Sequence, residues 1–339
     1  MIYFTGDVSL TDGYFNVGFG VGSNIARGMN PFMNIQKNSE DIWVGNFEGV
    51  ASVHSCNKGY RSNVFRIDPE LLGSIKLFDV WGVANNHAMQ HGEEAYWQTV
   101  NVLKEQGYKI FGTKLEKSSS LQYKKQTVCL TGMSLRIDEF TDTPCYWHNP
   151  EYRDIEVVVK SLSQESFKVL FVHWGNEYIN RPSVAQKKLA HWLVDIGFDL
   201  IIGMHPHVLQ GYEDYKDARI YYSLGNFVFD MPSTACRYGA IVGLDFDEQG
   251  KPIFSEEYVH IDNNGYPCLV DSHSVPTVYT WAYLNECLSK EDNSEPYHNE
   301  ALNGYLEYRK ANRRTIIKNM IYHPKSMVGI IGDFVKRKL

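Results

Sequence analysis

The chain has 339 residues, of which 43% are hydrophobic and 14% aromatic, enough to build a buried core and too many for a disordered chain. Its net charge of −7 argues against a general nucleic-acid binder, which needs a basic face. No apolar run is long enough for a membrane-spanning helix, and the N-terminal residues lack the pattern of a signal peptide. We therefore expect a cytoplasmic protein whose six cysteines are reduced and mostly buried.

Short apolar runs alternate with helical patterns along the first 230 residues. We expect strands at 2–5, 42–44, 77–83, 109–111, 127–131, 169–172, 200–202 and 220–222, and helices at 93–106, 150–162 and 182–196. The last helix is the clearest, because Pro182 stands at its start and Gly197 just past its end. This alternation predicts a mixed α/β domain with a largely parallel sheet.

The pattern changes toward the C-terminus. Residues 240–246 and 253–261 predict a hairpin, whereas 281–288 and 300–318 look helical. From Tyr305 onward nine Lys and Arg residues face two acidic ones, so this tail carries +7 and the rest of the chain −14. We therefore expect a first domain at 1–270 and a basic, helical extension at 271–339.

Polar residues follow closely after several of the predicted strands. They are Asp7, Glu48, Asn86, His87, His173, His205 and His207. Each has an ordinary explanation when taken alone, such as a helix cap or a buried core histidine. Because strand carboxyl ends converge on one crevice in open α/β sheets, their repeated position favours a single site. Carboxylate, amide oxygen and imidazole together are typical ligands of Zn, Mn or Fe.

The same segments carry a family resemblance. The matching motifs are Thr5-Gly6-Asp7, Gly45-Asn46-Phe47-Glu48, Phe65-Arg66, Ala84-Asn85-Asn86-His87, His173 to Tyr178, Gly203 to Gln210 with Glu213, and Tyr222 to Asp230. In this order they resemble the poly-γ-glutamate capsule synthesis (CapA-like) family, a bacterial branch of the calcineurin-like metallophosphatases. The resemblance implies a four-layer α/β/β/α sandwich with two divalent metal ions at one edge of the paired sheets.

The resemblance also implies a role for each residue. Asp7 and His207 would bind the first metal, and Glu48 would bridge to the second. Asn86, His173 and His205 would complete the second metal. His87 would be the catalytic histidine, which protonates a leaving group or holds a phosphoryl oxygen, and the nucleophile would be a water activated by the metals.

Two positions depart from the expected pattern. Ser9 stands where the wider superfamily often has a histidine, and Gln90 stands where the family usually has an aspartate. The first change predicts weaker binding of the first metal, and the second removes a charge that would stabilise a protonated His87. Weaker candidates for contacts with the substrate or the metal ligands are Asn46, Asn85, Arg66, Glu177, Gln210, Glu213 and Asn226.

Three functions remain open at this point. The first is phosphoester hydrolysis at a dinuclear centre in capsule or cell-surface polymer biosynthesis. The second is hydrolysis or transfer at an amide of an anionic polymer such as poly-γ-glutamate. The third is a non-catalytic binding component of a polymer synthesis or export complex.

The basic tail has two interpretations. We expect a helix up to Ile321, a break caused by Pro324 and Gly329, and a short second segment. The tail either packs on the acidic body of the same chain, which we favour slightly, or lies on the anionic inner face of a membrane as a peripheral contact.

Overall fold

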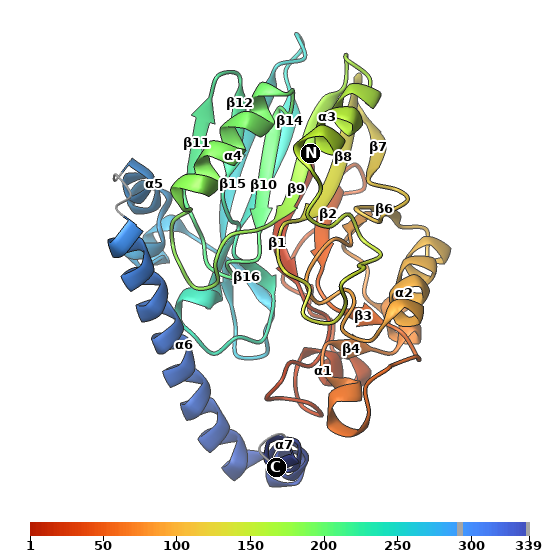
Figure 1. Cartoon of the computed structure of the whole chain (residues 1–339), viewed down its shortest axis with the longest axis vertical. Helices are drawn as coiled ribbons and strands as arrows, with labels where there is room; N and C mark the ends of the chain where they lie inside the picture. Colours follow the sequence, from red (N-terminus) through yellow and green to blue (C-terminus); the bar gives the residue numbers. More distant parts are fainter. Residues whose placement is uncertain (290–293, 337–339) are drawn as a thin grey trace.

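The computed structural model describes residues 1–289 and 294–336 and contains two large sheets (Figure 1). The order in the first sheet is β16-β15-β14-β1-β2-β5-β6, and β13 also pairs with β1. These strands are β1 (Ile2–Val8), β2 (Ile42–Phe47), β5 (Val80–Gly82), β6 (Lys109–Phe111), β13 (Asn226–Val228), β14 (Tyr238–Phe246), β15 (Pro252–Ile261) and β16 (Pro267–Val270). Strands β1, β2, β5 and β6 are parallel to one another, while β14, β15 and β16 form an antiparallel meander.

The second sheet has the order β11-β12-β10-β9-β8-β7. It contains β7 (Ser118–Tyr123), β8 (Gln126–Ser134), β9 (Phe167–His173), β10 (Leu200–Met204), β11 (Tyr212–Tyr215) and β12 (Ala218–Tyr221). Its inner strands are parallel and its two edge strands antiparallel. A separate two-stranded ladder joins β3 (Val50–Ala51) to β4 (Arg66–Ile67).

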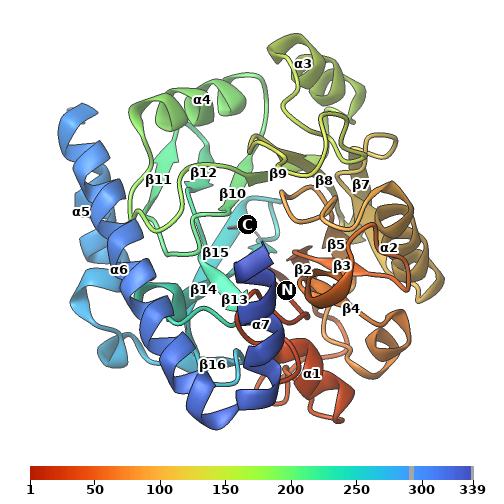
Figure 2. The same ribbon diagram turned by 60° about the horizontal axis from the view of Figure 1, so that its bottom comes forward.

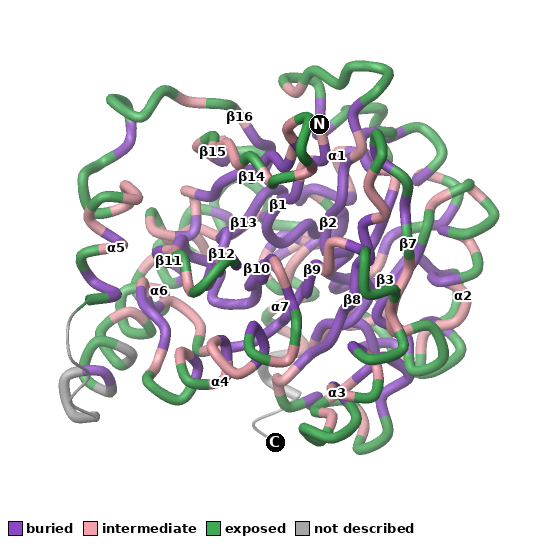
Figure 3. Tube along the Cα trace, turned by 90° about the horizontal axis from the view of Figure 1, so that it is seen from above, coloured by how far each residue is buried: buried purple, intermediate pink, exposed green. Residues whose placement is uncertain are grey.

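Three apolar layers hold the sheets and helices together. The central layer lies between the two sheets, where Phe171 of β9 meets Phe4 and Phe111 edge-on at 5.7 and 5.2 Å between ring centroids. An outer layer joins the first sheet to α1 (Val21–Ala26) and α2 (Glu93–Glu105). The other joins the second sheet to α3 (Tyr152–Ser161) and α4 (Val184–Asp195). Helices that pack on the outer faces of two facing sheets form the expected α/β/β/α sandwich, which is confirmed. In Figure 3 the central strands are mostly buried, whereas the helices around them are exposed on one side only.

Most predicted strands are present, several with longer bounds, and the helices predicted at 93–106, 150–162 and 182–196 are present with slightly shorter bounds. The apolar run 77–83 forms a strand only over Val80–Gly82. Strand β7 was not predicted, because its sequence Ser118-Ser119-Ser120 has no apolar run and its pairing with β8 holds it in place. Short 3-10 segments complete the chain: η1 (Gly59–Asn63), η2 (Pro69–Ser74), η3 (Ala235–Arg237), η4 (Ser272–Ser274) and η5 (Thr277–Tyr279).

The C-terminal segment forms α5 (Trp281–Ser289), α6 (Ser294–Tyr322) and α7 (Pro324–Lys336). The expected interruption at Gly329 is wrong, since this glycine lies inside α7, where a Cβ would come within 3.3 Å of Tyr60 in η1. Pro324 does break the helix, and it begins α7, where its missing N–H costs nothing. The basic residues Arg337 and Lys338 lie outside the described residues.

The tail packs on its own chain, as the favoured interpretation states. Helix α6 runs along one side of the molecule and α7 crosses in front of the strand ends (Figure 2). Tyr308 of α6 stacks on Tyr178 with 4.1 Å between ring centroids. Asn319 donates to the carbonyl of Phe15 at 3.0 Å. No helix in the described ranges is long and apolar enough to cross a membrane.

Candidate metal centre

Separate chain segments bring the seven predicted residues to the carboxyl ends of neighbouring strands. Asp7 is the second-last residue of β1, and Glu48 directly follows β2. His173 ends β9, and His205 directly follows β10. Asn86 and His87 lie in the loop after β5, and His207 lies two residues beyond His205. This is the placement that the parallel register of β1 with β2 and of β9 with β10 requires.

Asp7 lies at the middle of the cluster and is fully buried. Its Oδ1 accepts from Asn46 Nδ2 at 2.8 Å, and its Oδ2 accepts from the backbone N–H of His205 at 3.0 Å. Two imidazole nitrogens lie close to the same carboxylate: His207 Nδ1 at 3.5 Å and His173 Nδ1 at 3.8 Å. The carboxylate therefore joins β1 to the segments that follow β9 and β10.

His173, His205 and Asn86 form a second group of close contacts. The Nε2 atom of His173 lies 2.8 Å from Oδ1 of Asn86 and 3.2 Å from Nδ1 of His205. Both rings are almost completely buried, and their centroids are 4.8 Å apart. The Nδ1 atom of His173 and the Nε2 atom of His205 have no hydrogen-bond partner among the described residues.

Glu48 is the clearest indication that a cation belongs here. The side chain is completely buried, and neither oxygen has a hydrogen-bond partner in the described chain. Its Oε1 lies 3.8 Å from His207 Nε2 and from His87 Nε2. Ligand atoms that share a zinc ion at about 2.1 Å lie roughly 3–4 Å apart, so these spacings fit a divalent ion.

Burial leaves this cluster short of positive charge. It raises the pKa of Glu48 well above its usual value, and the nearby Asp7 carboxylate raises it further. Burial also raises the pKa of Asp7, which His207 and the N–H of His205 lower in part. It lowers the pKa of His173 and of His205 well below the usual value. Because the buried histidines stay neutral, no imidazolium balances the carboxylates of Asp7 and Glu48. A divalent cation bound by these groups would supply that positive charge.

The backbone around the two late histidines is in an uncommon conformation. His205 has φ +93° and His207 has φ +57°, a region that L side chains rarely adopt. His207 Nδ1 donates to Oδ1 of Asn226 at 2.8 Å, which holds its Nε2 toward Glu48. Strain of this kind persists only where surrounding structure enforces it, and it is typical of functional sites.

The candidate ligand atoms divide into two sets with no shared residue. One contains Asp7, Glu48 and His173, and the other Glu177, His205 and His207, with the atoms of each set within 4.8 Å of one another. The division differs from the assignment that the resemblance implies, because His173 groups with Asp7, His207 groups with His205, and Glu177 joins the histidines. Glu177 was considered from the sequence only as a weaker candidate, and its position four residues after His173 is the one signal that marks it.

His87 lies beside the cluster and is held by its neighbours. Its Nδ1–H donates to Oε1 of Gln90 at 2.7 Å, and Gln90 Nε2 donates to the Val64 carbonyl at 3.3 Å. The ring stacks on Phe65 with centroids 3.9 Å apart and an angle of 4°. Burial lowers the pKa of His87 to about 4, an effect that the Gln90 hydrogen bond opposes. Gln90 thus orients the ring as the family's aspartate would, without adding charge.

The structure places the weaker candidates in several surroundings. Asn85 Nδ2 donates to Asn46 Oδ1 at 3.2 Å, so both belong to the support of Asp7. Asn226 supports His207. The guanidinium of Arg66 binds the carbonyls of Ser52 and Ser62, not the cluster.

The remaining positions contact other parts of the chain. Gln210 donates to the Ile179 carbonyl at 2.8 Å. Glu213 accepts from His191 and from Tyr222. Ser9 shares a hydrogen bond with Thr11 at 2.8 Å, so its hydroxyl is engaged within its own loop.

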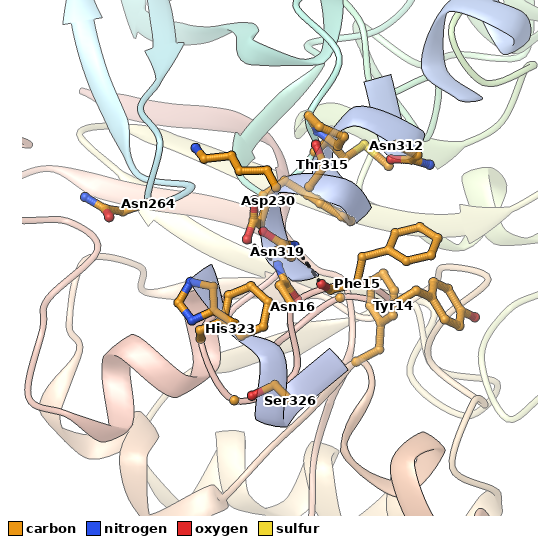
Figure 4. A pocket seen from close by; sticks show the side chains of 18 of the residues that line it. Tyr14, Phe15, Asn16, Asp230, Asn264, Asn312, Thr315, Asn319, His323 and Ser326 are labelled. Atoms are coloured by element: carbon orange, nitrogen blue, oxygen red, sulfur yellow. Dashed lines mark hydrogen bonds between the residues drawn. The ribbon is translucent and has the colours of Figure 1, made fainter. Parts of the chain in front are cut away.

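A cavity of about 1130 Å³ opens directly from the cluster. Asn86, His87, Glu177 and His207 line one end, and α6 and α7 supply much of the rest (Figure 4). The sequence analysis did not predict that α6 and α7 form one wall of this cavity. A signal was present, because cavity-lining residues recur on one face of α6 at helical spacing: Tyr308, Asn312, Thr315, Asn319 and Tyr322.

Comparison with known proteins identifies curated relatives. The PGA biosynthesis protein CapA of Bacillus subtilis is 30% identical over 236 residues, which are 62% of this chain and 59% of that protein. The capsule biosynthesis protein CapA of Bacillus anthracis is 30% identical over 256 residues, 68% of this chain and 59% of that protein. The chain thus spans less than two thirds of the length of these relatives.

Similarity to solved structures is distant. A putative 5'-nucleotidase from Staphylococcus aureus in complex with α-ketoglutarate aligns with 90% of this chain and 58% of its own, at a TM-score of 0.47 and 13% identity. Such an overlap carries no information about activity. The family model described as bacterial capsule synthesis protein PGA_cap matches residues 1–231, the segment that holds every residue of the cluster. The chain therefore belongs to the PGA_cap family of bacterial capsule synthesis proteins.

Proposed function

We propose that the protein is a metal-dependent phosphoester hydrolase with a dinuclear centre that acts in the biosynthesis of a capsule or another cell-surface polymer. The observation that carries the proposal is the buried carboxylate of Glu48, whose oxygens accept no hydrogen bond within 3.5 Å in the described chain and whose Oε1 lies 3.8 Å from the imidazoles of His87 and His207. A structural role alone gives no reason to bury an unpaired carboxylate beside Asp7.

The donor set assigns the groups that would hold the ions. Asp7, Glu48, Asn86, Glu177, His173, His205 and His207 supply carboxylate, amide and imidazole ligands, which suit Mn, Fe or Zn. Bound divalent ions supply Lewis-acid polarisation of a phosphoryl group and lower the pKa of a water molecule. Two such ions a few Å apart favour in-line displacement at phosphorus over reactions that use a single metal ion with one open coordination position.

The chain's own groups then complete the reaction. The water oxygen adds to phosphorus, and the bond from phosphorus to the alcohol oxygen breaks. The electron pair leaves on that oxygen, which takes the proton that the attacking water loses. His87, neutral and protonated at Nδ1, is placed to relay this proton: its Nε2 accepts it from the water and passes it to the leaving oxygen, because Gln90 fixes the Nδ1–H and Phe65 fixes the ring plane.

The proposal is tested by metal content and turnover together. Protein purified without added metal is expected to retain divalent ions and to hydrolyse an aryl phosphate when Mn is supplied. Retained metal with no turnover of any phosphate ester would refute the phosphoesterase and favour the non-catalytic binding component. That alternative has one specific support, the absence of a ligand at Ser9.

The biological setting is part of the same proposal. The relatives are named for PGA or capsule biosynthesis, which supports a polymer-related role here. Participation in a capsule-synthesis complex is inferred on the same grounds.

A further inference from the structure

One wall of the cavity beside the metal centre is built by a part of the chain outside the family match. The match ends at residue 231, whereas α6 contributes Tyr308, Asn312 and Asn319 to the lining and α7 contributes Lys325 and Ser326. Figure 4 shows side chains of these helices facing the 14–16 loop. The wall is anchored, since Asn319 binds the Phe15 carbonyl and Tyr308 stacks on Tyr178. A wall of this kind selects what reaches the metal centre.

The lining is rich in neutral hydrogen-bonding groups. The side-chain amides are those of Asn16, Asn24, Asn86, Asn263, Asn264, Asn312 and Asn319. Asn16 and Asn312 are 6% and 9% exposed, and the Oδ1 atom of each has no donor among the described residues. A ligand with several hydroxyl or N–H groups supplies such donors.

Aromatic rings alternate with these amides. Phe140 is 40% exposed at the end nearest the metal centre, with its ring 6.4 Å from that of His87. Tyr322 is 68% exposed where α6 ends. Rings beside amides fit a molecule that presents C–H faces and polar edges, and a saccharide ring has both.

The charges that line the cavity nearly balance, so it lacks the strongly basic lining that a polymer with a carboxylate on every unit would need. Four cationic side chains line the cavity (Arg27, Arg237, Lys318 and Lys325), and three acidic ones oppose them (Glu139, Glu177 and Asp230). Asp230 already accepts a hydrogen bond from Asn16, so a ligand carboxylate beside it would meet a like charge. A ligand with a single phosphoryl group at the metal end avoids this repulsion.

We propose that the cavity binds the sugar of a phosphorylated saccharide and presents its phosphoryl group to the metal centre. This inference rests on the proposed phosphoesterase function and names its substrate class. The sugar ring packs on Phe140 and bonds to the amides of the α6 wall, while the phosphoryl group lies toward Asn86, His87 and His207.

Calorimetric titration of the Mn-loaded protein tests the inference, with phosphonate analogues that hydrolysis cannot consume. The probes are the phosphonate analogues of hexose and N-acetylhexosamine 1-phosphates and of glycerol 3-phosphate, together with γ-linked pentaglutamate. At least one sugar phosphonate is expected to bind about tenfold more tightly than the glycerol phosphonate or pentaglutamate, a difference of one or two buried hydrogen bonds. Tighter binding of pentaglutamate, or equal binding of all probes, would overturn the inference.

Matched variants locate the binding. Asn312→Leu and Phe140→Ala are each expected to weaken sugar-phosphate binding about tenfold, the equivalent of one lost buried contact. Asn303→Leu, exposed on α6, and Tyr152→Ala, exposed on α3, are the controls and should bind like the parent. Phe140 is on a surface loop, so this variant folds even if Asn312→Leu does not. Unchanged binding in Phe140→Ala would contradict the placement.

The two proposals fail in different ways. Turnover of an aryl phosphate without any preference for sugar phosphates would retain the phosphoesterase and refute this substrate class. Tight, variant-sensitive sugar-phosphate binding with no turnover would refute the phosphoesterase and retain the saccharide site.

Discussion

Replacing Glu48 with glutamine should stabilise the metal-free protein and remove most of the stabilisation that metal binding gives. In metal-free protein the parent buries a carboxylate that has no hydrogen-bond partner and lies beside Asp7. The neutral amide removes this cost, so the metal-free Glu48→Gln variant should be more stable than the metal-free parent by about 1–3 kcal/mol. At a metal concentration of about 100 Kd the parent gains roughly 2.7 kcal/mol, and the variant gains much less.

These free energies correspond to measurable shifts in the unfolding temperature Tm. With an unfolding entropy of about 2.1 cal/mol/K per residue, 1 kcal/mol corresponds to roughly 1.5 °C for 339 residues. The parent's Tm should therefore rise by about 4 °C on addition of Mn or Zn after chelator treatment. The metal-free variant should start about 2–4 °C above the parent and respond little.

Scanning calorimetry with and without metal is the assay, and Glu248→Gln, exposed in the turn between β14 and β15, is the matched control. The control should behave as the parent in both states. If Glu48→Gln lowers the metal-free Tm and keeps the full metal-dependent increase, the assignment of Glu48 as a ligand is wrong.

Three further outcomes are expected. His87→Gln should leave metal content unchanged and lower turnover about 10²–10⁴-fold, and loss of metal would make His87 a ligand. Gly203→Ala should destabilise the protein by at least about 3 kcal/mol, because its Cβ would lie 2.0 Å from the Tyr222 carbonyl. Gly73→Ala, with open space around the new Cβ, is the control. Equal Tm values for the two variants would contradict this prediction. The tail packs on its own chain, yet Ile317, Ile321 and Val328 stay exposed near the basic Arg313 and Arg314, so we propose that this exposed side also contacts anionic membranes and expect salt-sensitive flotation with phosphatidylglycerol vesicles. Val328→Asp should weaken this flotation, whereas Ile253→Asp, at an exposed position on β15, should not. If the two variants float equally well, the proposed membrane contact is wrong.

The sequence predicted the strands and the residues at their ends well, because both depend on local patterns. Buried parallel strands appear as short apolar runs, and a ligand at a strand end is adjacent to its run, as His173 is to 169–172. The apolar run also explains the one misjudged strand. Leu77 and Phe78 are buried because they pack in the loop before β5, not because they pair in the sheet.

Other features depend on contacts between distant residues and were missed for that reason. Polar β7 is a strand only because β8 pairs with it. His91 follows β5 in a polar segment with no local sign of burial, yet it is 2% exposed and bonds to Ser55 and the Val64 carbonyl. The cavity wall likewise requires α6 to return across the strand ends, which no local pattern specifies.

Diffraction at the Mn absorption edge from crystals grown with Mn tests the metal centre most directly. Two anomalous peaks are expected within ligand distance of Glu48, one reached by Asp7 and His173 and one by His205 and His207. Peaks that lie elsewhere, or no peak near Glu48 at saturating Mn, would contradict the account.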